Sequence, residues 1–267
     1  LKKRFPHCLI IGTRKSGTRA LLEFLSLHPS VVAAKKETHF FDSDENFRKG
    51  LKWYLNFMPP STENQITVEK TPAYFFSGKV PARIKRTEVE ANGSGGRMKF
   101  LLIVKDPVER ALSDYAKVLQ SKQKQNIRYP TFEELSTDPI TDEITSAYRP
   151  IRRSLYNLQL RNWLKHFKRS QLQVVDGAAL VTNPVHELQK VEKFLGLQKF
   201  LTSDKFIWSQ DRGFYFANVT KIRTKCLSTS KGLAHPRLSD RFTEKIRNFF
   251  RPFNEDFYNL TRMNFDW

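Results

Sequence analysis

The sequence has few cysteines, no long apolar run and a shortage of acidic residues. Its two cysteines, Cys8 and Cys226, and its 6 histidines show no metal-ligand spacing, which argues against a structural zinc site. No apolar run approaches the roughly 20 residues that cross a bilayer. No signal peptide opens the chain, and the start at Leu1 predicts that further residues precede it.

The shortage of acids leaves a large positive charge. There are 46 lysines and arginines against 27 acidic residues, which gives a formal net charge of +19. The basic residues are spread along the chain, so we expect a positively charged face or cleft. Such a face suits a polyanion. The charge alone does not decide whether this polyanion is a nucleic acid, an anionic lipid or a sulfated glycan. A soluble basic surface without a partner is the alternative.

The apolar residues are numerous enough for one large domain, and their pattern predicts its class. Hydrophobic residues make up 39% of the chain, with 22 phenylalanines. Runs such as Phe100–Val104 lack alternation, which is typical of parallel strands covered on both faces. The expected strands are Leu9–Gly12, Val31–Ala34, Gln65–Glu69, Lys99–Lys105 and Leu172–Asp176.

Helical patterns lie between these strands. The expected helices are Ala20–Leu27, Pro107–Gln120, Ser154–His166 and a C-terminal helix with its apolar face at Phe242, Ile246, Phe249, Phe250 and Phe253. We predict an α/β fold, P-loop-like, with a doubly wound parallel sheet between helices and its ligand site beyond the carboxyl ends of the strands. The stretches Glu90–Gly96 and Leu119–Pro130 read as flexible surface segments and do not divide the predicted single domain, residues 1–267.

The stretch "CLIIGTRKSGTRALLEF" predicts an anion-binding loop. A strand ends at Gly12, and Gly17 opens a helix for which Thr18 could serve as the cap. A Walker loop would continue G-K-[ST], whereas here the lysine, Lys15, lies inside the loop. Arg14, Lys15 and Arg19 surround a helix N-terminus, where cations are unfavourable unless an anion joins them. The alternative is an ordinary strand-to-helix turn, which also needs glycine.

A carboxylate and an imidazole follow the second strand, in "KKETHFFD". Glu37 and His39 are two residues apart, so in an extended chain they point the same way, at the carboxyl edge of the sheet. Beside the cations of the loop, Glu37 would stay ionised and could accept a proton from a hydroxyl. The alternative is a surface glutamate with His39 packed on Phe40 and Phe41.

Two further stretches leave their roles open. In "LLIVKDPVERALSDY", Asp106 resembles the Mg²⁺ ligand of a Walker B strand, but Lys105 and Ser113 could equally donate to a second phosphate. In "CLSTSKGLAHP", Lys231 and Gly232 could close over a nucleotide.

These stretches together resemble the heparan sulfate glucosaminyl 3-O-sulfotransferases. The loop Arg14–Arg19 is similar to that family's 5′-phosphosulfate loop, and "ETHFFD" is similar to its E-x-H-F-F-D element. The other similar elements, in the family's order, are "VEKTPAYF", "DPVERALSDY", "RSLY", "VVDG", "GFY", "SKG.AHP" and the closing "FDW". The resemblance covers nearly the whole chain.

The resemblance implies a P-loop-like α/β fold and 3′-phosphoadenylyl sulfate (PAPS) as donor, with PAP as product and no metal requirement. Lys15 would neutralise the leaving 5′-phosphate, and Glu37 would be the base, supported by His39 and Asp42. The implied nucleotide-binding residues are Lys15, Ser16, Gly17, Thr18, Arg19, Lys105, Ser113, Tyr215, Lys231, Gly232 and His235. The implied glycan-binding residues are Arg14, Arg19, Lys36, Lys70 and Lys117.

The resemblance also implies a setting. Heparan sulfate would be the partner, rather than nucleic acid, and the protein would be a monomer in the Golgi lumen. It would be a type II membrane protein or a secreted lumenal enzyme, with any membrane anchor outside this sequence. The sequons at Asn92, Asn218 and Asn259 permit a glycoprotein of the secretory pathway.

Several positions depart from the family's pattern. Ser16 replaces a loop glycine, which is tolerable if its φ is negative, and Lys117 replaces a glutamine. Leu233 replaces an arginine, and Phe216 replaces the cysteine that would pair with Cys226, so we expect no disulfide between Cys226 and Cys8. The alternatives to a sulfotransferase are a Mg²⁺-dependent P-loop NTPase or kinase, and a non-catalytic polyanion-binding module.

Overall fold

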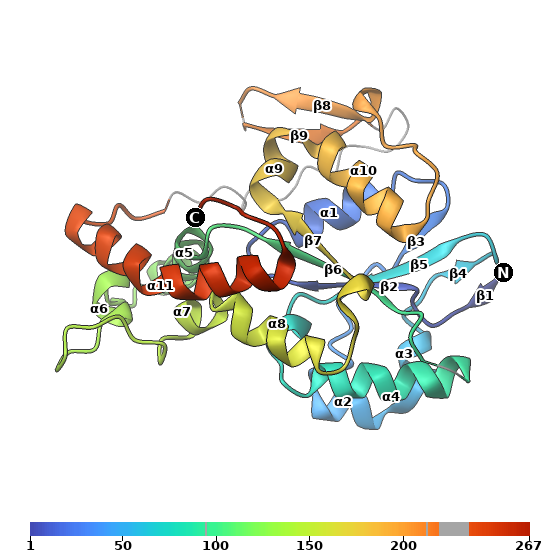
Figure 1. Cartoon of the computed structure of the whole chain (residues 1–267), viewed down its shortest axis with the longest axis horizontal. Helices are drawn as coiled ribbons and strands as arrows, with labels where there is room; N and C mark the ends of the chain where they lie inside the picture. The colour runs from blue at the N-terminus through green and yellow to red at the C-terminus, as the bar shows by residue number, and fades with distance from the viewer. Residues whose placement is uncertain (94, 212, 219–234) are drawn as a thin grey trace. The chain divides into compact units, whose positions relative to one another are not determined.

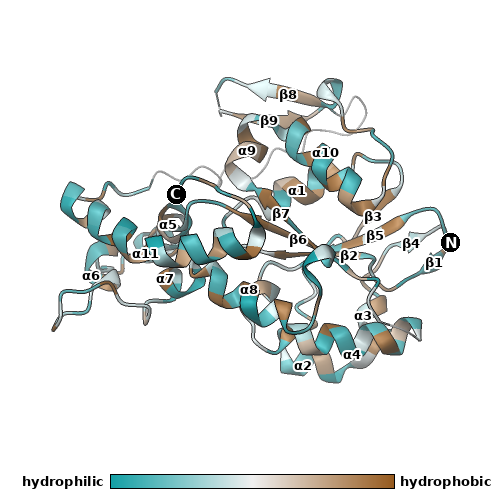
Figure 2. Ribbon diagram, viewed as in Figure 1, coloured by the Kyte–Doolittle hydropathy of each residue, from teal (hydrophilic) through white to brown (hydrophobic). Residues whose placement is uncertain are grey.

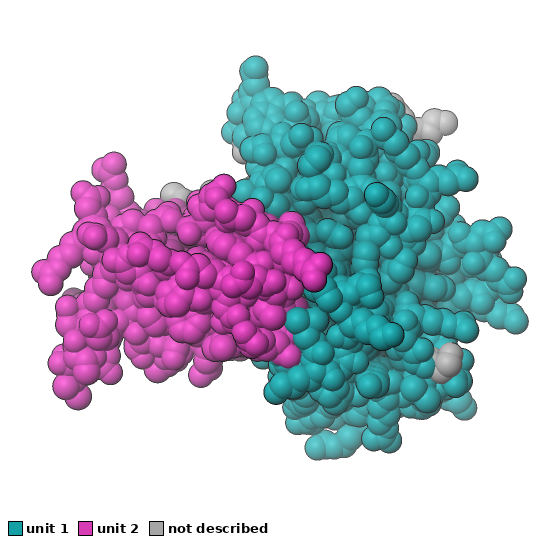
Figure 3. Space-filling view, in the orientation of Figure 1, with its two compact units in different colours: residues 1–104, 162–224 teal, residues 105–161, 225–267 magenta. Residues whose placement is uncertain are grey.

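The computed structural model of the chain describes residues 1–93, 95–211, 213–218 and 235–267 (Figure 1). The chain divides into two compact units, coloured separately in Figure 3. The first contains residues 1–104 and 162–224, and the second contains residues 105–161 and 225–267. The extent of the catalytic domain, residues 1–267, stays a prediction.

A five-stranded parallel sheet forms the centre of the first unit, with the strands in the order β3-β5-β2-β6-β7. Leu9 of β2 lies opposite Glu69 of β5 on one side and Phe100 of β6 on the other. The strands are β2 (Cys8–Gly12), β3 (Val31–Ala33), β5 (Ile66–Lys70), β6 (Lys99–Val104) and β7 (Leu172–Asp176). All five were predicted from their apolar runs, within one residue at each end.

Both faces of this sheet are covered, as the runs without alternation predicted. Cys8 and Ile10 of β2 belong to one apolar cluster, into which α1 (Thr18–Leu25), α9 (Gly177–Thr182) and α10 (Pro184–Leu195) also pack. Figure 1 shows α2, α3 and α4 on the opposite face, and the strands are brown, hydrophobic ribbons in Figure 2. The predicted α/β class with a sheet between two helical layers is confirmed.

Shorter elements complete the first unit. Two antiparallel pairs flank the main sheet, β1 with β4 and β8 with β9. The remaining bounds are β1 (Lys2–Lys3), β4 (Pro60–Ser61), β8 (Phe206–Ser209), β9 (Phe214–Ala217), α2 (Asp44–Arg48), α3 (Gly50–Leu55), α4 (Val80–Asn92), and the 3-10 turns η1 (Tyr74–Phe76), η2 (Arg169–Gln171) and η3 (Ser203–Lys205).

The second unit is helical around its own apolar core. Its helices are α5 (Pro107–Gln123), α6 (Phe132–Ser136), α7 (Arg149–Arg153), α11 (Asp240–Thr261) and the first residues of α8 (Tyr156–Leu164). The face predicted for the C-terminal helix is confirmed, because Phe242, Ile246 and Phe250 are buried in this core, with Phe249 and Phe253 packed against it. Within the described residues, no helix combines the length and apolar character needed to cross a bilayer.

Two expectations about flexible segments were wrong in part. Helix α5 continues to Gln123, so the stretch Leu119–Pro130 begins inside a helix, and at the other end of the stretch the Tyr115 hydroxyl donates to the Pro130 carbonyl at 3.0 Å. Helix α4 likewise continues to Asn92, into the stretch Glu90–Gly96. The helix expected over about Ser154–His166 is confirmed as α8, which spans Tyr156–Leu164.

Candidate active site

The anion-binding loop predicted between Gly12 and Thr18 connects β2 to α1. Two hydrogen bonds hold the loop in place. The Thr13 amide donates to the Ile103 carbonyl at 2.6 Å, and the Thr13 and Ser16 hydroxyls are hydrogen-bonded to each other at 2.6 Å. Ser16 is buried and its φ is not positive, so serine is tolerated where the family has glycine.

Gly17, rather than Thr18, is the N-cap of α1, which corrects the expectation for Thr18. Its φ of 107° lies in the left-handed region that favours glycine, and a Cβ there would meet Ile103 at 3.3 Å. No side chain caps the first turn of α1, and that turn contains no acidic residue. Its amide groups are therefore available to a negatively charged group, and the loop fits a phosphate or sulfate.

The cations of this segment differ in exposure. Lys15 is half-buried within the loop and has a positive φ of 78°, while Arg14 and Arg19 are exposed. Arg19 forms an ion pair with Glu23, one turn along α1, at 2.6 Å. Of the three, Lys15 is therefore the cation that the fold holds most closely to the loop.

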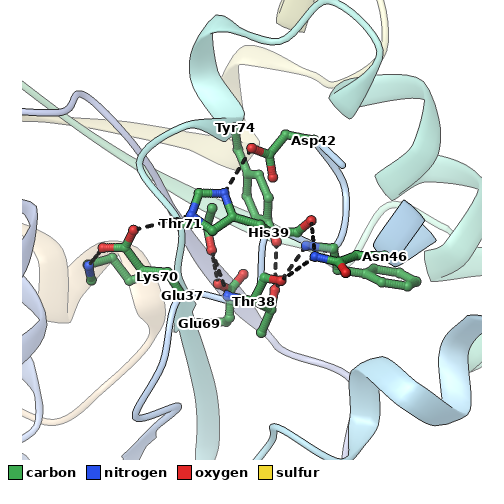
Figure 4. Close-up of polar contacts among 10 residues, drawn as sticks. Glu37, Thr38, His39, Asp42, Asn46, Glu69, Lys70, Thr71 and Tyr74 are labelled. Atoms are coloured by element: carbon green, nitrogen blue, oxygen red, sulfur yellow. Dashed lines mark hydrogen bonds and ion pairs between the residues drawn. The ribbon is translucent and has the colours of Figure 1, made fainter. Parts of the chain in front are cut away.

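A row of interacting charged side chains follows β3 and β5, at the carboxyl edge of the sheet. Glu37 is ion-paired with Lys70, the last residue of β5, and its Oε2 lies 3.7 Å from Nε2 of His39 (Figure 4). Nδ1 of His39 lies 2.9 Å from Oδ2 of Asp42. The prediction that Glu37 and His39 point the same way is confirmed, and Lys70 and Asp42 extend the group.

The backbone of this segment is fixed by its neighbours. Phe40 stacks on Tyr54 with 4.6 Å between ring centroids, and both rings are buried. Asn46 donates to the carbonyls of Thr38 and His39 at 3.2 and 3.3 Å, which holds His39 at a positive φ of 48°. The phenylalanine side chains thus anchor the segment in the core while Glu37 and His39 stay accessible to a substrate.

A polar network below this segment was not predicted. Glu69 of β5 is fully buried and accepts a hydrogen bond from the Thr71 hydroxyl at 2.5 Å. Burial raises the pKa of Glu69 to about 7, against the opposing effects of the Thr71 hydrogen bond and of Lys70. The one sequence signal for Glu69 is that a charged residue stands in an otherwise buried strand.

In the second unit, α5 presents the residues predicted for a second phosphate. Lys105 directly follows β6 and pairs with Glu109 at 2.8 Å. Glu109, Ser113 and Lys117 are spaced by four residues, so they share one face of α5. Ser113 and Lys117 are half-buried there.

Asp106 has a structural role. Its Oδ1 accepts the amides of Val108 and Glu109 and so caps α5, and its Oδ2 lies 3.4 Å from Arg247. Within the described ranges, no group of three histidine, cysteine or acidic side chains is placed to hold a metal. Both carboxylate oxygens of Asp106 are thus engaged within the second unit, while metal independence stays a prediction.

The structure describes some of the remaining predicted residues, and the others lie outside the described ranges. Tyr215 of β9 packs its ring against Trp208 at 5.0 Å and lines a hollow of about 410 Å³. Lys36 and His235 are exposed. Cys8 is buried in the core of the first unit. Four other positions discussed above, Lys231, Gly232, Leu233 and Cys226, lie outside the described residues.

Two sequence motifs of the second unit are joined by structural hydrogen bonds. Arg110, within "DPVERALSDY", is fully buried and donates to the Ser154 hydroxyl at 2.7 Å and to the Pro150 carbonyl. Ser154 in turn donates to the Pro107 carbonyl at 2.8 Å. Two of the resembling motifs are therefore joined by a buried arginine.

Comparisons with known proteins agree with this geometry. The sulfotransferase domain family matches residues 5–263. Heparan sulfate glucosamine 3-O-sulfotransferase 5 of Homo sapiens is 46% identical over 267 residues, which are 100% of this chain and 75% of that protein. The 3A1 enzyme of Mus musculus is 40% identical, over 99% of this chain and 65% of its own length.

The fold has solved counterparts. A sulfotransferase from Alicyclobacillus acidocaldarius superposes with a TM-score of 0.68 at 20% identity and covers 97% of each chain. That likeness establishes the fold, and the higher identities establish the narrower family. The chain belongs to the sulfotransferase domain family and, within it, to the heparan sulfate glucosamine 3-O-sulfotransferases.

Proposed function

We propose that the protein transfers a sulfuryl group from PAPS to the 3-hydroxyl of a glucosamine residue in heparan sulfate, with Glu37 as the general base. The observation that carries this proposal is the placement of Glu37, with Lys70 and His39, at the carboxyl edge of the parallel sheet. The relatives of 46% and 40% identity carry this activity in their names.

The loop residues and Glu37 of the first unit have chemical tasks in this proposal. PAPS supplies the sulfuryl group and leaves as PAP when the bond between sulfur and the 5′-phosphate oxygen breaks. Lys15 and the first-turn amides of α1 stabilise the negative charge that grows on that oxygen. Glu37 takes the proton of the 3-hydroxyl as its oxygen bonds to sulfur. A sulfuryl group carries less charge than a phosphoryl group, so the reaction has less need of a metal clamp.

His39, Asp42 and Lys70 set the position of the base. The hydrogen bond between His39 and Asp42, at 2.9 Å, fixes the imidazole beside Glu37. Lys70 is ion-paired with Glu37 and could turn toward a sulfate of the glycan once the acceptor binds. Arg14, Arg19, Lys36 and Lys117 add cations for the glycan, and Lys105, Ser113, Tyr215, Lys231, Gly232 and His235 are proposed for the nucleotide.

The setting is proposed on the same family grounds. We infer that the enzyme works as a monomer in the Golgi lumen, with heparan sulfate rather than nucleic acid as partner. The heparan sulfate named for the relatives supports this choice of partner, and the excess of basic residues suits a polyanion.

The test is sulfate transfer from radiolabelled PAPS to heparan sulfate, with and without EDTA, followed by disaccharide analysis. We expect 3-O-sulfated glucosamine as product and an unchanged rate in EDTA. Label at the 6-O or N position, or none in the polysaccharide, would contradict the proposal. Loss of the rate in EDTA would contradict metal independence alone.

A further inference from the structure

The buried Glu69 has no task in the chemistry above, although it is the chain neighbour of Lys70. Glu69 is the second-last residue of β5, and its side chain is completely inaccessible to solvent. Side chains of a strand alternate between faces, so Glu69 points away from the face toward which Lys70 points. A buried carboxyl group is unfavourable unless neighbours satisfy it, so its partners indicate its role.

The partners of Glu69 lead to the peptide bond after Glu37. The Thr71 hydroxyl donates to Oε1 of Glu69 at 2.5 Å and accepts from the amide of Thr38 at 3.2 Å (Figure 4). That amide belongs to the peptide that joins Glu37 to Thr38. The Thr38 hydroxyl is in turn bonded to the Tyr74 hydroxyl at 2.9 Å. The network is buried, so water does not compete with it.

We propose that Glu69 and Thr71 are positioning residues for the transfer reaction: through the Thr38 amide they hold the backbone from which Glu37 reaches the acceptor hydroxyl. This inference rests on the proposed function and adds to it two residues that do not touch the substrate. The base must stand within hydrogen-bond reach of the hydroxyl, and small displacements of such groups reduce the rate strongly.

The direction of the Thr71 hydrogen bond depends on the charge of Glu69. A hydroxyl has one hydrogen, and while Thr71 gives it to ionised Glu69 its lone pairs remain open to the Thr38 amide. A protonated Glu69 can donate to Thr71 instead; the Thr71 hydrogen then turns to another acceptor, and the lone pair offered to the Thr38 amide is reoriented. Because burial brings the pKa of Glu69 to about 7, both forms occur near neutral pH.

The surroundings of Glu69 contain three other titratable groups. Tyr54 of α3 has its hydroxyl 3.5 Å from Oε2 of Glu69, and Lys70 follows Glu69 on the same strand. Tyr74 of η1 bonds the Thr38 hydroxyl and also acts on Glu69 directly through its side chain. Burial raises the pKa of both tyrosines, so they stay neutral where Glu69 titrates. Lys70 favours the ionised form of Glu69.

The first test compares Thr71→Val with Thr71→Ser. Valine keeps the shape and removes the hydroxyl, so we expect kcat to fall on the order of 10-fold to 100-fold, with KM for PAPS and for heparan sulfate within about twofold. Serine keeps the hydroxyl and should restore kcat to within about threefold of wild type. Thr87→Val is the control, because Thr87 is also buried but bonds the Arg83 carbonyl within α4.

Two results would overturn the inference: Thr71→Val retaining wild-type kcat, or Thr87→Val losing as much kcat as Thr71→Val for the same loss of thermal stability. A wild-type chain that transfers no sulfate would remove the proposed function itself, and this inference with it. The two failures are therefore distinguishable.

The second test uses the pH dependence of kcat and holds even if Thr71→Val does not fold. In the wild type we expect kcat to rise through about pH 7 as Glu69 ionises, and in Glu69→Gln this step should be absent. Glu88→Gln is the control, because Glu88 is also buried but accepts amides of residues 96–98. Superimposable profiles of wild type and Glu69→Gln would overturn the proposal.

Discussion

At the residue scale, Lys15 is the group whose removal should cost most. Lys15 is half-buried in its loop, and in the proposed reaction it neutralises the charge that grows on the leaving phosphate. We expect Lys15→Ala to lower the transfer rate on the order of 10²-fold to 10³-fold while the thermal unfolding midpoint stays unchanged. The exposed Lys193→Ala on α10 serves as a charge-matched control. Transfer by Lys15→Ala within tenfold of wild type would refute the role of this lysine.

Glu69 also predicts how the stability of the fold changes with pH. Its pKa is raised in the fold from 4.5 to about 7, so between these values the folded chain binds a proton that the unfolded chain has released. The contribution of Glu69 to the free energy of unfolding is therefore fully present below pH 4.5 and is lost as pH rises to about 7, by up to about 3 kcal/mol.

In Glu69→Gln, the free energy of unfolding should not show this decrease as pH rises to about 7. Chemical denaturation of both proteins between about pH 4.5 and 8 measures the difference, and a Glu69→Gln stability that falls in parallel with the wild type would contradict the assigned pKa.

Residues at chain positions with a clear local signal could be predicted, and residues defined by long-range contacts could not. Glu37 and His39 follow a strand and are separated by two positions in the sequence. This spacing is enough to predict that their side chains lie close together. Thr71 and Thr38 are 33 positions apart, and their hydrogen bond depends on the pairing of β3 with β5. No pattern in the sequence shows that pairing.

At the scale of the elements, substitution of Asp106 distinguishes its role as the cap of α5 from a role as a metal ligand. Asparagine caps helices about as well as aspartate, whereas alanine removes a cap worth roughly 0.5–2 kcal/mol. We expect Asp106→Asn to keep transfer within about threefold of wild type and Asp106→Ala to lose about 1 kcal/mol of stability. Abolished transfer in Asp106→Asn, together with a normal unfolding midpoint, would speak for a ligand role after all.

Buried strands were easier to predict than helix ends or short elements. A run such as Phe100–Val104 is apolar on both faces, which fixes its environment without knowledge of its partners. The end of α5 could not be placed, because residues 120–123 are polar and helical only as the continuation of an amphipathic helix. The β8–β9 pair was missed, since its strands are short and half-exposed.

At the scale of the whole molecule, the net charge of +19 predicts a salt-sensitive encounter with the polysaccharide. Raising the ionic strength from about 0.1 M to about 1 M shortens the screening length from roughly 10 Å to roughly 3 Å. We expect KM for heparan sulfate to rise about tenfold or more over this range, while kcat at saturation changes little. A KM for heparan sulfate that is independent of salt would show that the basic surface has no part in substrate binding.

The central claim is that Glu37 acts as the base, which separates an enzyme from a basic glycan-binding protein. Glu37→Gln keeps the shape, removes the proton acceptor and releases Lys70 from its ion pair. We expect transfer to fall roughly 10²-fold or more, with the affinities for PAP and for a heparan sulfate oligosaccharide, measured by calorimetric titration, held or slightly increased. A loss of affinity in step with the loss of activity would contradict the account, because Glu37 would then be a structural residue and the proton would go elsewhere.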